Sequence, residues 1–403
     1  MKRINLGRAF VIAGLASQVI VYSVLWVRMI TSAAERTGTD FIAFYSAGRI
    51  ALTGKISDAY LPQAQKAMEE SELGFSIADE ALNPFVHPPF IIPILALIAN
   101  LPYVSAFYAW AIILMSIFAV AVSFLVRLMP PGRDRKVLIA SSLLFFPVFV
   151  SILNGQDSAL LLLGASIWLF GLVKGDDRLA GIGLALTTIR PHIALLLAIP
   201  FLFKSRKVWW WFIAGAAGLA VFSFLVVGIK GTENFLHILT ISASGEGYKI
   251  NEAAMINFLG LLRRLVPSLA SEPARGVSWV VYFLGIIFLC IIWARAERIT
   301  VRHAGSAILV ALLAAPHLHY HDLVLLLIPL FCVIVIIRNG KYLDQGVAGH
   351  FPLITSWLLI VSNFLPALKF SIPYLLGLIL AASLRCPGIV FKRWLKAGEH
   401  QQI

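Results

Sequence analysis

The residues of this chain that could do chemistry form five polar groups separated by long apolar stretches. The groups are Asp40, His87, the run Asn154-Gly155-Gln156, Arg190, and the run from His317 to Asp322. A carboxylate such as Asp40 can take a proton from a hydroxyl as a general base. The planar fork of Arg190 can bind a phosphate through two parallel hydrogen bonds. These residue types indicate a site for a hydroxyl and a phosphate.

Both charged residues also have a structural interpretation. Asp40 could cap a helix or form an ion pair with Arg36 or Arg49. Arg190 could support a helix end or pair with Asp157. The sequence alone leaves these alternatives open.

Three histidines alternate in the run His317, His319 and His321, so on an extended segment they can share one face. The pattern favours binding of a phosphate or hydroxyl, and it permits a metal ion without demanding one. Asp322 could be an N-cap of the helix that follows. We therefore predict no required cofactor, with a divalent metal ion possible but not indicated.

Two further polar residues are candidates for the wall of a cavity. His87 precedes Pro88 and Pro89, and a residue before proline favours an extended conformation. Gln156 opens an apolar stretch, where its amide could bind a sugar hydroxyl or bridge two helices.

The composition places these groups in a membrane protein. The 403 residues are 60% hydrophobic and 13% charged, whereas soluble proteins carry roughly 25% charged residues. Lipid accepts apolar side chains on the outside of a helix bundle, and water does not. The net charge of +13 would suggest a nucleic-acid partner in a soluble protein. Here we predict an all-α polytopic membrane protein with the lipid bilayer, and no nucleic acid, as a partner.

The distribution of basic residues predicts the topology, because Lys and Arg in short loops stay preferentially on the cytoplasmic side. We place inside the N-terminus and residues 127–136, 174–178, 204–207, 295–302, 338–341 and 385–396. The acid-rich segment 31–84 then faces outward. All five polar groups fall on that outer face, around one cavity.

We expect a single integral-membrane domain over residues 1–403. It comprises a first helix (1–30), an extracytoplasmic loop with interfacial helices (31–84), a helix bundle (85–384) and a cytoplasmic tail (385–403). The apolar stretches of the bundle are approximately 86–101, 102–126, 137–153, 156–173, 179–203, 208–229, 276–294, 304–316, 322–337, 349–367 and 371–384.

Three of these regions are irregular. The charges place residue 84 outside and residue 127 inside, which requires an odd number of membrane crossings between them. The two apolar stretches 86–101 and 102–126 would give two crossings, so we expect residues 86–101 to form a partial, tilted or re-entrant segment. Residues 179–203 are broken at Arg190-Pro191, and a similar break lies at 317–322. Irregular backbone at membrane depth is tolerated only where protein or a wet cavity surrounds it. Residues 253–269 are amphipathic, which is typical of a helix on the membrane surface.

Several motifs resemble those of glycosyltransferase family 87, which uses sugars carried on a polyprenyl phosphate. The resemblance is most specific in the first hundred residues and becomes looser toward residue 340. The motifs are Asp40-Phe-Ile-Ala-Phe-Tyr45-Ser-Ala-Gly48, Gly54, Asp58-Ala-Tyr60, Val86-His87-Pro88-Pro89-Phe90, Asn154-Gly155-Gln156, Leu179-Ala-Gly181 and Arg190-Pro191.

This resemblance implies a GT-C-like bundle of about 10–12 transmembrane or re-entrant helices. It also implies that Asp40, which matches the family's acidic residue after the first helix, is the catalytic base. The family usually has lysine where this chain has Arg190. Near Pro316 its mannosyltransferases tend to have a Ser/Trp-rich segment ending in paired histidines, where this chain has Ala315-Pro316-His317-Leu318-His319-Tyr320-His321-Asp322. This departure leaves the donor sugar open.

We therefore expect an inverting glycosyltransferase, resembling a hexosyl- or mannosyltransferase, in the cell (inner) membrane, with both termini cytoplasmic and the site extracytoplasmic. It would move a mannose-like hexose or a pentose from a polyprenyl-phosphate donor to a glycolipid or glycan hydroxyl. The expected phosphate ligands are Arg190, His319, His321 and His87, and the expected substrate ligands are Tyr45, Gln156, His317 and Asp322. The alternative is a transporter or flippase for a lipid-linked sugar, for which broken helices are also expected.

Overall fold

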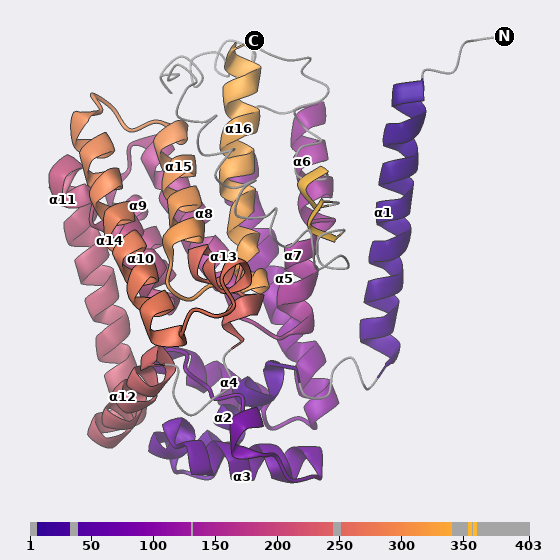
Figure 1. Ribbon diagram of the computed structural model, residues 1–403, viewed down its shortest axis with the longest axis vertical. Coiled ribbons are helices and arrows are strands. Elements are labelled where there is room, and N and C mark those ends of the chain that lie inside the picture. The colour runs from indigo at the N-terminus through magenta and orange to yellow at the C-terminus, as the bar shows by residue number, and fades with distance from the viewer. Residues whose placement is uncertain are drawn as a thin grey trace.

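The protein is all-α in the part of the chain that the computed structural model describes, which is residues 6–32, 39–129, 132–244, 251–340, 354–356 and 358–360. Those residues contain no strand, and most of the helices run roughly side by side (Figure 1). The predicted all-α class is confirmed. Most of the predicted spans 349–367 and 371–384 and the tail 385–403 lie outside the described residues.

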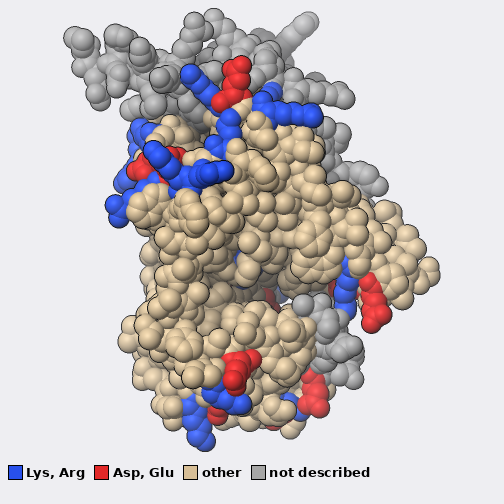
Figure 2. All heavy atoms as spheres, turned by 90° about the vertical axis from the view of Figure 1, so that its left-hand side faces the viewer, with Lys and Arg blue, Asp and Glu red and all other residues tan. Residues whose placement is uncertain are grey.

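The surface is that of a membrane protein. Among the described residues, three helices are long and apolar enough to cross a bilayer: α5 (Tyr103–Arg127), α12 (Arg206–Ser244) and α14 (Ser271–Arg295). On the face drawn in Figure 2, Lys and Arg gather at one end, and a belt with few charged atoms separates them from a mixed group at the other end. This pattern matches an apolar belt facing lipid between two polar surfaces.

One end of the molecule is a layer of short helices (bottom of Figure 1). Its elements are α2 (Phe41–Leu52), η1 (Ile56–Tyr60), α3 (Pro62–Leu73), η2 (Asp79–Ala81), η3 (Pro89–Ile91) and α4 (Ile92–Ile98). We call this the lower layer. Helix α2 packs against α3, α4 and η1. It approaches α4 so closely that a Cβ on Gly48 would lie 2.5 Å from the carbonyl oxygen of Leu95.

The short helix α4 explains why the chain between residues 84 and 127 has two apolar stretches although its charges require an odd number of membrane crossings. It has seven residues, which makes it roughly 10 Å long, about a third of the hydrocarbon thickness. It lies beside α2 in the lower layer. Between residues 84 and 127, α5 is therefore the one helix long enough to cross.

Three helical hairpins reach toward the lower layer from the other end of the molecule. The first joins α6 (Arg133–Leu143) and α7 (Phe146–Leu153) to α8 (Ser158–Lys174). The second joins α9 (Asp177–Leu186) and η4 (Thr187–Ile189) to α10 (Pro191–Ala198) and α11 (Phe201–Lys204). The third joins α15 (Val301–Ala314) to η6 (Tyr320–Leu326) and α16 (Leu327–Gly340).

The apices of the hairpins meet, since η6 contacts α7 and α8, and α8 contacts η4. Both predicted breaks, at Arg190-Pro191 and at 317–322, are confirmed as apices of this kind. Pro191 begins α10, where its missing N–H is tolerated.

Glycine brings two of the hairpins together tightly. A Cβ on Gly164 of α8 would lie 2.8 Å from the carbonyl oxygen of Gly183 in α9, and one on Gly183 would lie 2.4 Å from the amide nitrogen of Trp168. Trp168 in turn stacks on Trp293 of α14, with ring centroids 6.4 Å apart. Small residues that allow close backbone approach are typical of helix contacts in membranes.

The region after residue 205 agrees with the sequence pattern and adds one element to it. The stretch 208–229 corresponds to the first part of α12, whose helical backbone is interrupted at Gly228 with φ +68°. A second helical part, which the sequence pattern did not predict, continues from this kink to Ser244. The amphipathic stretch 253–269 forms η5 (Glu252–Ala254) and the short α13 (Phe258–Leu265).

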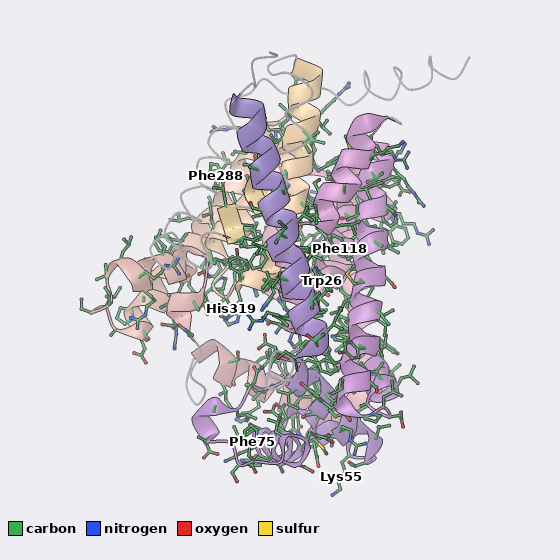
Figure 3. All side chains as sticks on the ribbon, turned by 90° about the vertical axis from the view of Figure 1, so that its right-hand side faces the viewer. Trp26, Lys55, Phe75, Phe118, Phe288 and His319 are labelled. Carbon is green, nitrogen blue, oxygen red and sulfur yellow. The ribbon has the colours of Figure 1, made fainter. Side chains whose placement is uncertain are left out.

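Helix α1 (Leu6–Thr31) lies at the edge of the bundle (Figures 1 and 3). Its contacts with the bundle include Trp26, whose ring centroid lies 5.3 Å from that of Phe149 in α7, and Gln18, which donates to the carbonyl of Leu144. The chain then enters the lower layer at Asp40.

Candidate active site

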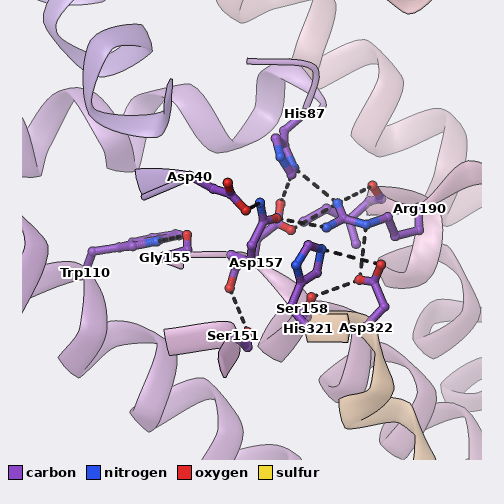
Figure 4. A network of polar contacts seen from close by, with 12 residues as sticks. Asp40, His87, Trp110, Ser151, Gly155, Asp157, Ser158, Arg190, His321 and Asp322 are labelled. Carbon is purple, nitrogen blue, oxygen red and sulfur yellow. Dashed lines mark hydrogen bonds and ion pairs between the residues drawn. The ribbon is translucent and has the colours of Figure 1, made fainter. Parts of the chain in front are cut away.

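The polar groups singled out in the sequence gather where the three apices meet the lower layer (Figure 4). The lower layer contributes Asp40, at the start of α2, and His87, just before η3. The hairpins contribute Gln156, Arg190 and Asp322. Residues more than a hundred positions apart thus join one network of hydrogen bonds and ion pairs.

Asp40 is held by two side-chain amides. Asn83 Nδ2 donates to its Oδ1 at 3.1 Å, and Gln156 Nε2 donates to its Oδ2 at 2.7 Å. Asp40 occupies the N-cap position of α2, but its side chain makes no capping hydrogen bond. Arg49 pairs with Glu72 at 3.1 Å, and Arg36 lies outside the described residues. The carboxylate is therefore oriented by neutral donors toward the centre of the site.

Gln156 links Asp40 to Arg190. Its Nε2 donates to Asp40, and its Oε1 accepts from Arg190 Nη2 at 3.2 Å. The preceding Gly155 has φ +68°, and a Cβ there would lie 2.6 Å from Cβ of Phe41. Trp110 fixes the same turn by donating from Nε1 to the Gly155 carbonyl at 2.7 Å. Glycine is required here because the turn needs a positive φ and the backbones are in close contact.

Arg190 is surrounded by protein partners. Its Nη1 lies 3.1 Å from Asp157 Oδ1, and its Nε lies 3.4 Å from Asp322 Oδ1. The Asp157 side chain is fully buried, and the Arg190 side chain is 11% exposed. Pairing with Asp157, one of the two interpretations of Arg190, is confirmed as a contact. We call Asp157, Arg190 and Asp322 the charged hub.

His87 attaches the lower layer to the hub. Its Nδ1 lies 2.7 Å from Asp157 Oδ2 and 3.2 Å from Arg190 Nη1. Its ring packs on Phe44, with centroids 4.4 Å apart. The expected position in a cavity wall therefore becomes a specific bond to a buried carboxylate.

The histidine run forms the third apex. The ring centroids of His317 and His319 lie 4.8 Å apart, and those of His319 and His321 lie 5.9 Å apart. No group of three His, Cys, Asp or Glu side chains in the described ranges is arranged to hold a metal ion. His319 lies between the hairpins and the lower layer (Figure 3).

The prediction that Asp322 could be an N-cap is wrong by three positions. His319 is the N-cap of η6, and Asp322 at N3 accepts from the amide of His319 in a capping box. Asp322 also accepts from Ser158 Oγ at 2.9 Å and lies 3.6 Å from His321 Nε2. A capping box uses an acidic residue at N3. The acidic side chain of Asp322 therefore indicated the start of a helix correctly, but it did not show which position of that start Asp322 occupies.

The structure leaves Tyr45 outside the network and adds residues that the sequence did not single out. Tyr45 is buried in α2, and its hydroxyl donates to the carbonyl of Leu101 at 2.9 Å. The additions are Asn83 on Asp40 and Ser158 on Asp322. Asn83 precedes Pro84 in the sequence, which indicates a turn or loop but gives no sign of a contact with Asp40.

The fold and the site define a polytopic membrane protein with an internal polar site. The chain matches the model of glycosyltransferase family 87 over residues 85–316, which is more than half of its length. It therefore belongs to this family, and the resemblance found in the sequence is confirmed. No curated protein matches the chain.

The match covers His87, Gln156 and Arg190. Asp40 and Tyr45 precede the matched residues, and the histidine run follows them. The protein is thus a membrane glycosyltransferase by family, while the role of Asp40 depends on geometry and on the resemblance of the first hundred residues.

Proposed function

We propose that this glycosyltransferase transfers a sugar from a polyprenyl-phosphate donor to a hydroxyl of a glycolipid or glycan, with inversion and with Asp40 as general base. The sugar would be a mannose-like hexose or a pentose. The reaction would take place on the extracytoplasmic side of the membrane. Family membership supports the glycosyltransferase class over the transporter or flippase alternative.

The observation that carries this proposal is the contrast among three carboxylates. Asp157 and Asp322 are buried, at 0% and 1% exposure, and both pair with Arg190. Asp40 is partly exposed, and its two hydrogen bonds come from the neutral amides of Asn83 and Gln156. A base must reach the proton that it takes, so Asp40 is best suited of the three.

The reaction balances around Asp40. The acceptor oxygen forms a bond to the anomeric carbon while the bond from that carbon to the phosphate oxygen breaks. Asp40 takes the acceptor proton, and polyprenyl phosphate leaves with the bonding electrons. Attack from the face opposite the phosphate inverts the anomeric centre.

The departing phosphate needs positive charge or hydrogen-bond donors. We propose that His319 and His321 bind it directly and that Arg190 and His87 provide hydrogen-bond donors behind them. Each guanidinium nitrogen of Arg190 already contacts a protein group, in Asp157, Asp322 or Gln156. Direct contact between Arg190 and phosphate would exchange one of these partners.

The sugar would lie beside Gln156, His317 and the capping region around Asp322. Gln156 is 8% exposed and bonds to both Asp40 and Arg190, so a sugar hydroxyl bound there would be close to base and hub alike. The buried hydroxyl of Tyr45 is bonded to Leu101. We propose that Tyr45 supports α2, and through it Asp40, without touching the sugar.

The distribution of charge supports the proposed extracytoplasmic position of the site. Basic residues at the helix ends opposite the lower layer would be cytoplasmic by the positive-inside rule. They include Arg127 of α5, Lys174 of α8, Lys204 of α11 and Arg295 of α14. Both termini and the tail would share that side.

The test uses the purified protein in lipid with a panel of radiolabelled polyprenyl-phosphate sugars and a membrane glycolipid extract. Wild type is compared with Asp40→Asn and with Asp79→Asn, a change in η2 whose exposed carboxylate pairs with Lys66. We expect transfer from one donor by wild type and Asp79→Asn, and a loss of at least about 100-fold in Asp40→Asn. Donor translocation without transfer by any variant would instead support a flippase.

A further inference from the structure

The segment from Asn83 to His87 crosses from the lower layer to the hairpin apices and is held by side chains on both sides. It lies between η2 and η3 and includes no helix. We call these five residues the strap. Pro84 lies within it and Pro88 follows it directly, which restricts the backbone of the residues before them.

The lower layer binds the backbone of the strap at every second residue. The backbone of Asn83 lies next to the Glu69 carboxyl and opposes the rise in its pKa that burial causes. The Phe85 N–H donates to Gln65 Oε1 at 2.7 Å, and Gln65 Nε2 lies 3.5 Å from the Phe85 carbonyl. The Tyr60 hydroxyl donates to the His87 carbonyl at 2.7 Å.

These partners are polar but buried, with 0% exposure at Gln65 and 1% at Glu69 and Tyr60. Gln65 and Glu69 are four residues apart on α3, so they share one helix face. The rest of α3 is mostly polar and at least partly exposed. Burying a polar side chain is unfavourable unless it is hydrogen-bonded. This face of α3 therefore serves to hold the strap.

The side chains at the two ends of the strap reach the two kinds of carboxylate in the site. Asn83 donates to Asp40, and His87 bonds to Asp157 of the charged hub. Between them, Phe85 is fully buried against Phe44 and Tyr60. The strap thus fixes the distance between the proposed base and the hub.

We propose that the strap is a positioning element for catalysis, in which Asn83 orients the Asp40 carboxylate and Gln65, Glu69 and Tyr60 hold the strap in register. This inference rests on the proposed role of Asp40 as base. It assigns a function to the acid-rich loop, whose α3 is otherwise distant from the network. Asn83, Gln65 and Glu69 act through Asp40 and are positioning residues.

The first test compares Asn83→Ala with Asn100→Ala, whose exposed amide donates to carbonyls at the end of α4. Loss of a hydrogen bond to a charged group should lower kcat about 10-fold, while the donor KM stays within about twofold of wild type. The acidic limb of the pH–rate profile should move to higher pH, because a lost donor disfavours the charged carboxylate. Asn100→Ala should change neither.

Asn83→Asp sharpens this test, since it places a second carboxylate 3.1 Å from Asp40 with little change in volume. The acidic limb should then move further than in Asn83→Ala, because like charges disfavour ionisation. Wild-type kcat and an unmoved limb in both variants would overturn the proposal.

The second test acts on the strap from α3. Glu69→Gln keeps an acceptor next to the backbone of Asn83, whereas Glu69→Met removes it at similar volume. We expect Glu69→Gln to retain kcat within about threefold of wild type and Glu69→Met to resemble Asn83→Ala. Equal activities of these two variants, both folded, would contradict a role for Glu69 in holding the strap.

The strap and the proposed function can fail separately. If Asp40→Asn is inactive and Asn83→Ala behaves as wild type, the strap proposal is wrong and the function stands. If wild type transfers no sugar, a Fab-bound cryo-EM structure of Asn83→Ala decides the strap proposal. We expect the Asp40 carboxylate to leave its wild-type orientation there. An unchanged Asp40 held by Gln156 alone would overturn the proposal.

Discussion

The charged hub and the surroundings of Asp40 are adjacent but built differently. In the hub, Arg190 is enclosed by Asp157 and Asp322, and opposite charges compensate one another away from water. Asp40 has neutral donors and remains partly exposed. The comparison teaches that the most heavily charged part of this site holds the apices together, while the carboxylate proposed as the base lies at its edge.

The largest expected effect is a difference in stability between a variant of the charged hub and a variant of Asp40. Asp157→Ala leaves Arg190 with one buried carboxylate fewer and removes the partner of His87. Breaking a buried ion pair costs about 3–5 kcal/mol of the free energy of unfolding. Unfolding in detergent should therefore begin at much lower denaturant for Asp157→Ala than for Asp40→Asn. Equal stabilities would remove the distinction between hub and base.

A second effect is a pH dependence of protein stability that originates at Glu69 in the lower layer. Burial raises the pKa of the Glu69 carboxyl from 4.5 to about 8. When the pKa of a group is higher in the folded state than in the unfolded state, its contribution to stability is fully present below the unfolded-state pKa. This contribution is lost as the pH rises through the folded-state pKa. Wild-type stability should thus fall relative to Glu69→Gln between pH 4.5 and 8, by up to about 1 kcal/mol per pH unit. Thermal unfolding of both proteins across this range measures the difference, and a constant difference would contradict it.

A third effect joins the two regions at the turn before Gln156. Gly155→Ala introduces a Cβ that would lie 2.6 Å from Phe41 Cβ, at a residue with φ +68°. Strain of this kind costs about 1–3 kcal/mol, and any relaxation would displace Gln156 from Asp40. Both the unfolding midpoint and kcat should fall. Gly175→Ala, which has φ +72° with nothing within 4 Å, should destabilise the protein without a comparable loss of kcat.

The smallest expected effect concerns Tyr45. Tyr45→Phe removes one hydrogen bond to the Leu101 carbonyl, worth about 1 kcal/mol. Transfer and the KM for both substrates should stay within about twofold of wild type. A large rise in acceptor or donor KM with unchanged stability would return Tyr45 to the substrate site.

The sequence predicts best what depends on local chemistry. Proline after Arg190 predicts the break between η4 and α10, and the odd number of crossings that the charges require predicts a partial, tilted or re-entrant segment where the short α4 lies. The residues that could be predicted for the site were those whose types are unusual in an apolar chain. Arg190, His87 and Gln156 do meet in one network.

What the sequence could not predict depends on packing between distant segments. Pro84 beside Asn83 indicates a turn but not a partner, and the contact of Asn83 with Asp40 joins two segments that are 43 positions apart. Tyr45 lies in the same motif as Asp40, yet the turn of α2 directs its hydroxyl to Leu101. The second helical part of α12, from the kink at Gly228 to Ser244, was not predicted because Lys230 and Glu233 interrupt the apolar pattern there.

The most direct test of the central claim measures stability and chemistry on the same samples. Wild type, Asp40→Asn and Asp157→Asn are reconstituted in one lipid mixture, and unfolding and single-turnover sugar transfer are recorded for each. We expect Asp40→Asn to unfold as wild type does and to lose transfer by at least about 100-fold, and Asp157→Asn to lose stability as well. Near-normal transfer by a folded Asp40→Asn protein would contradict the assignment of Asp40 as the base.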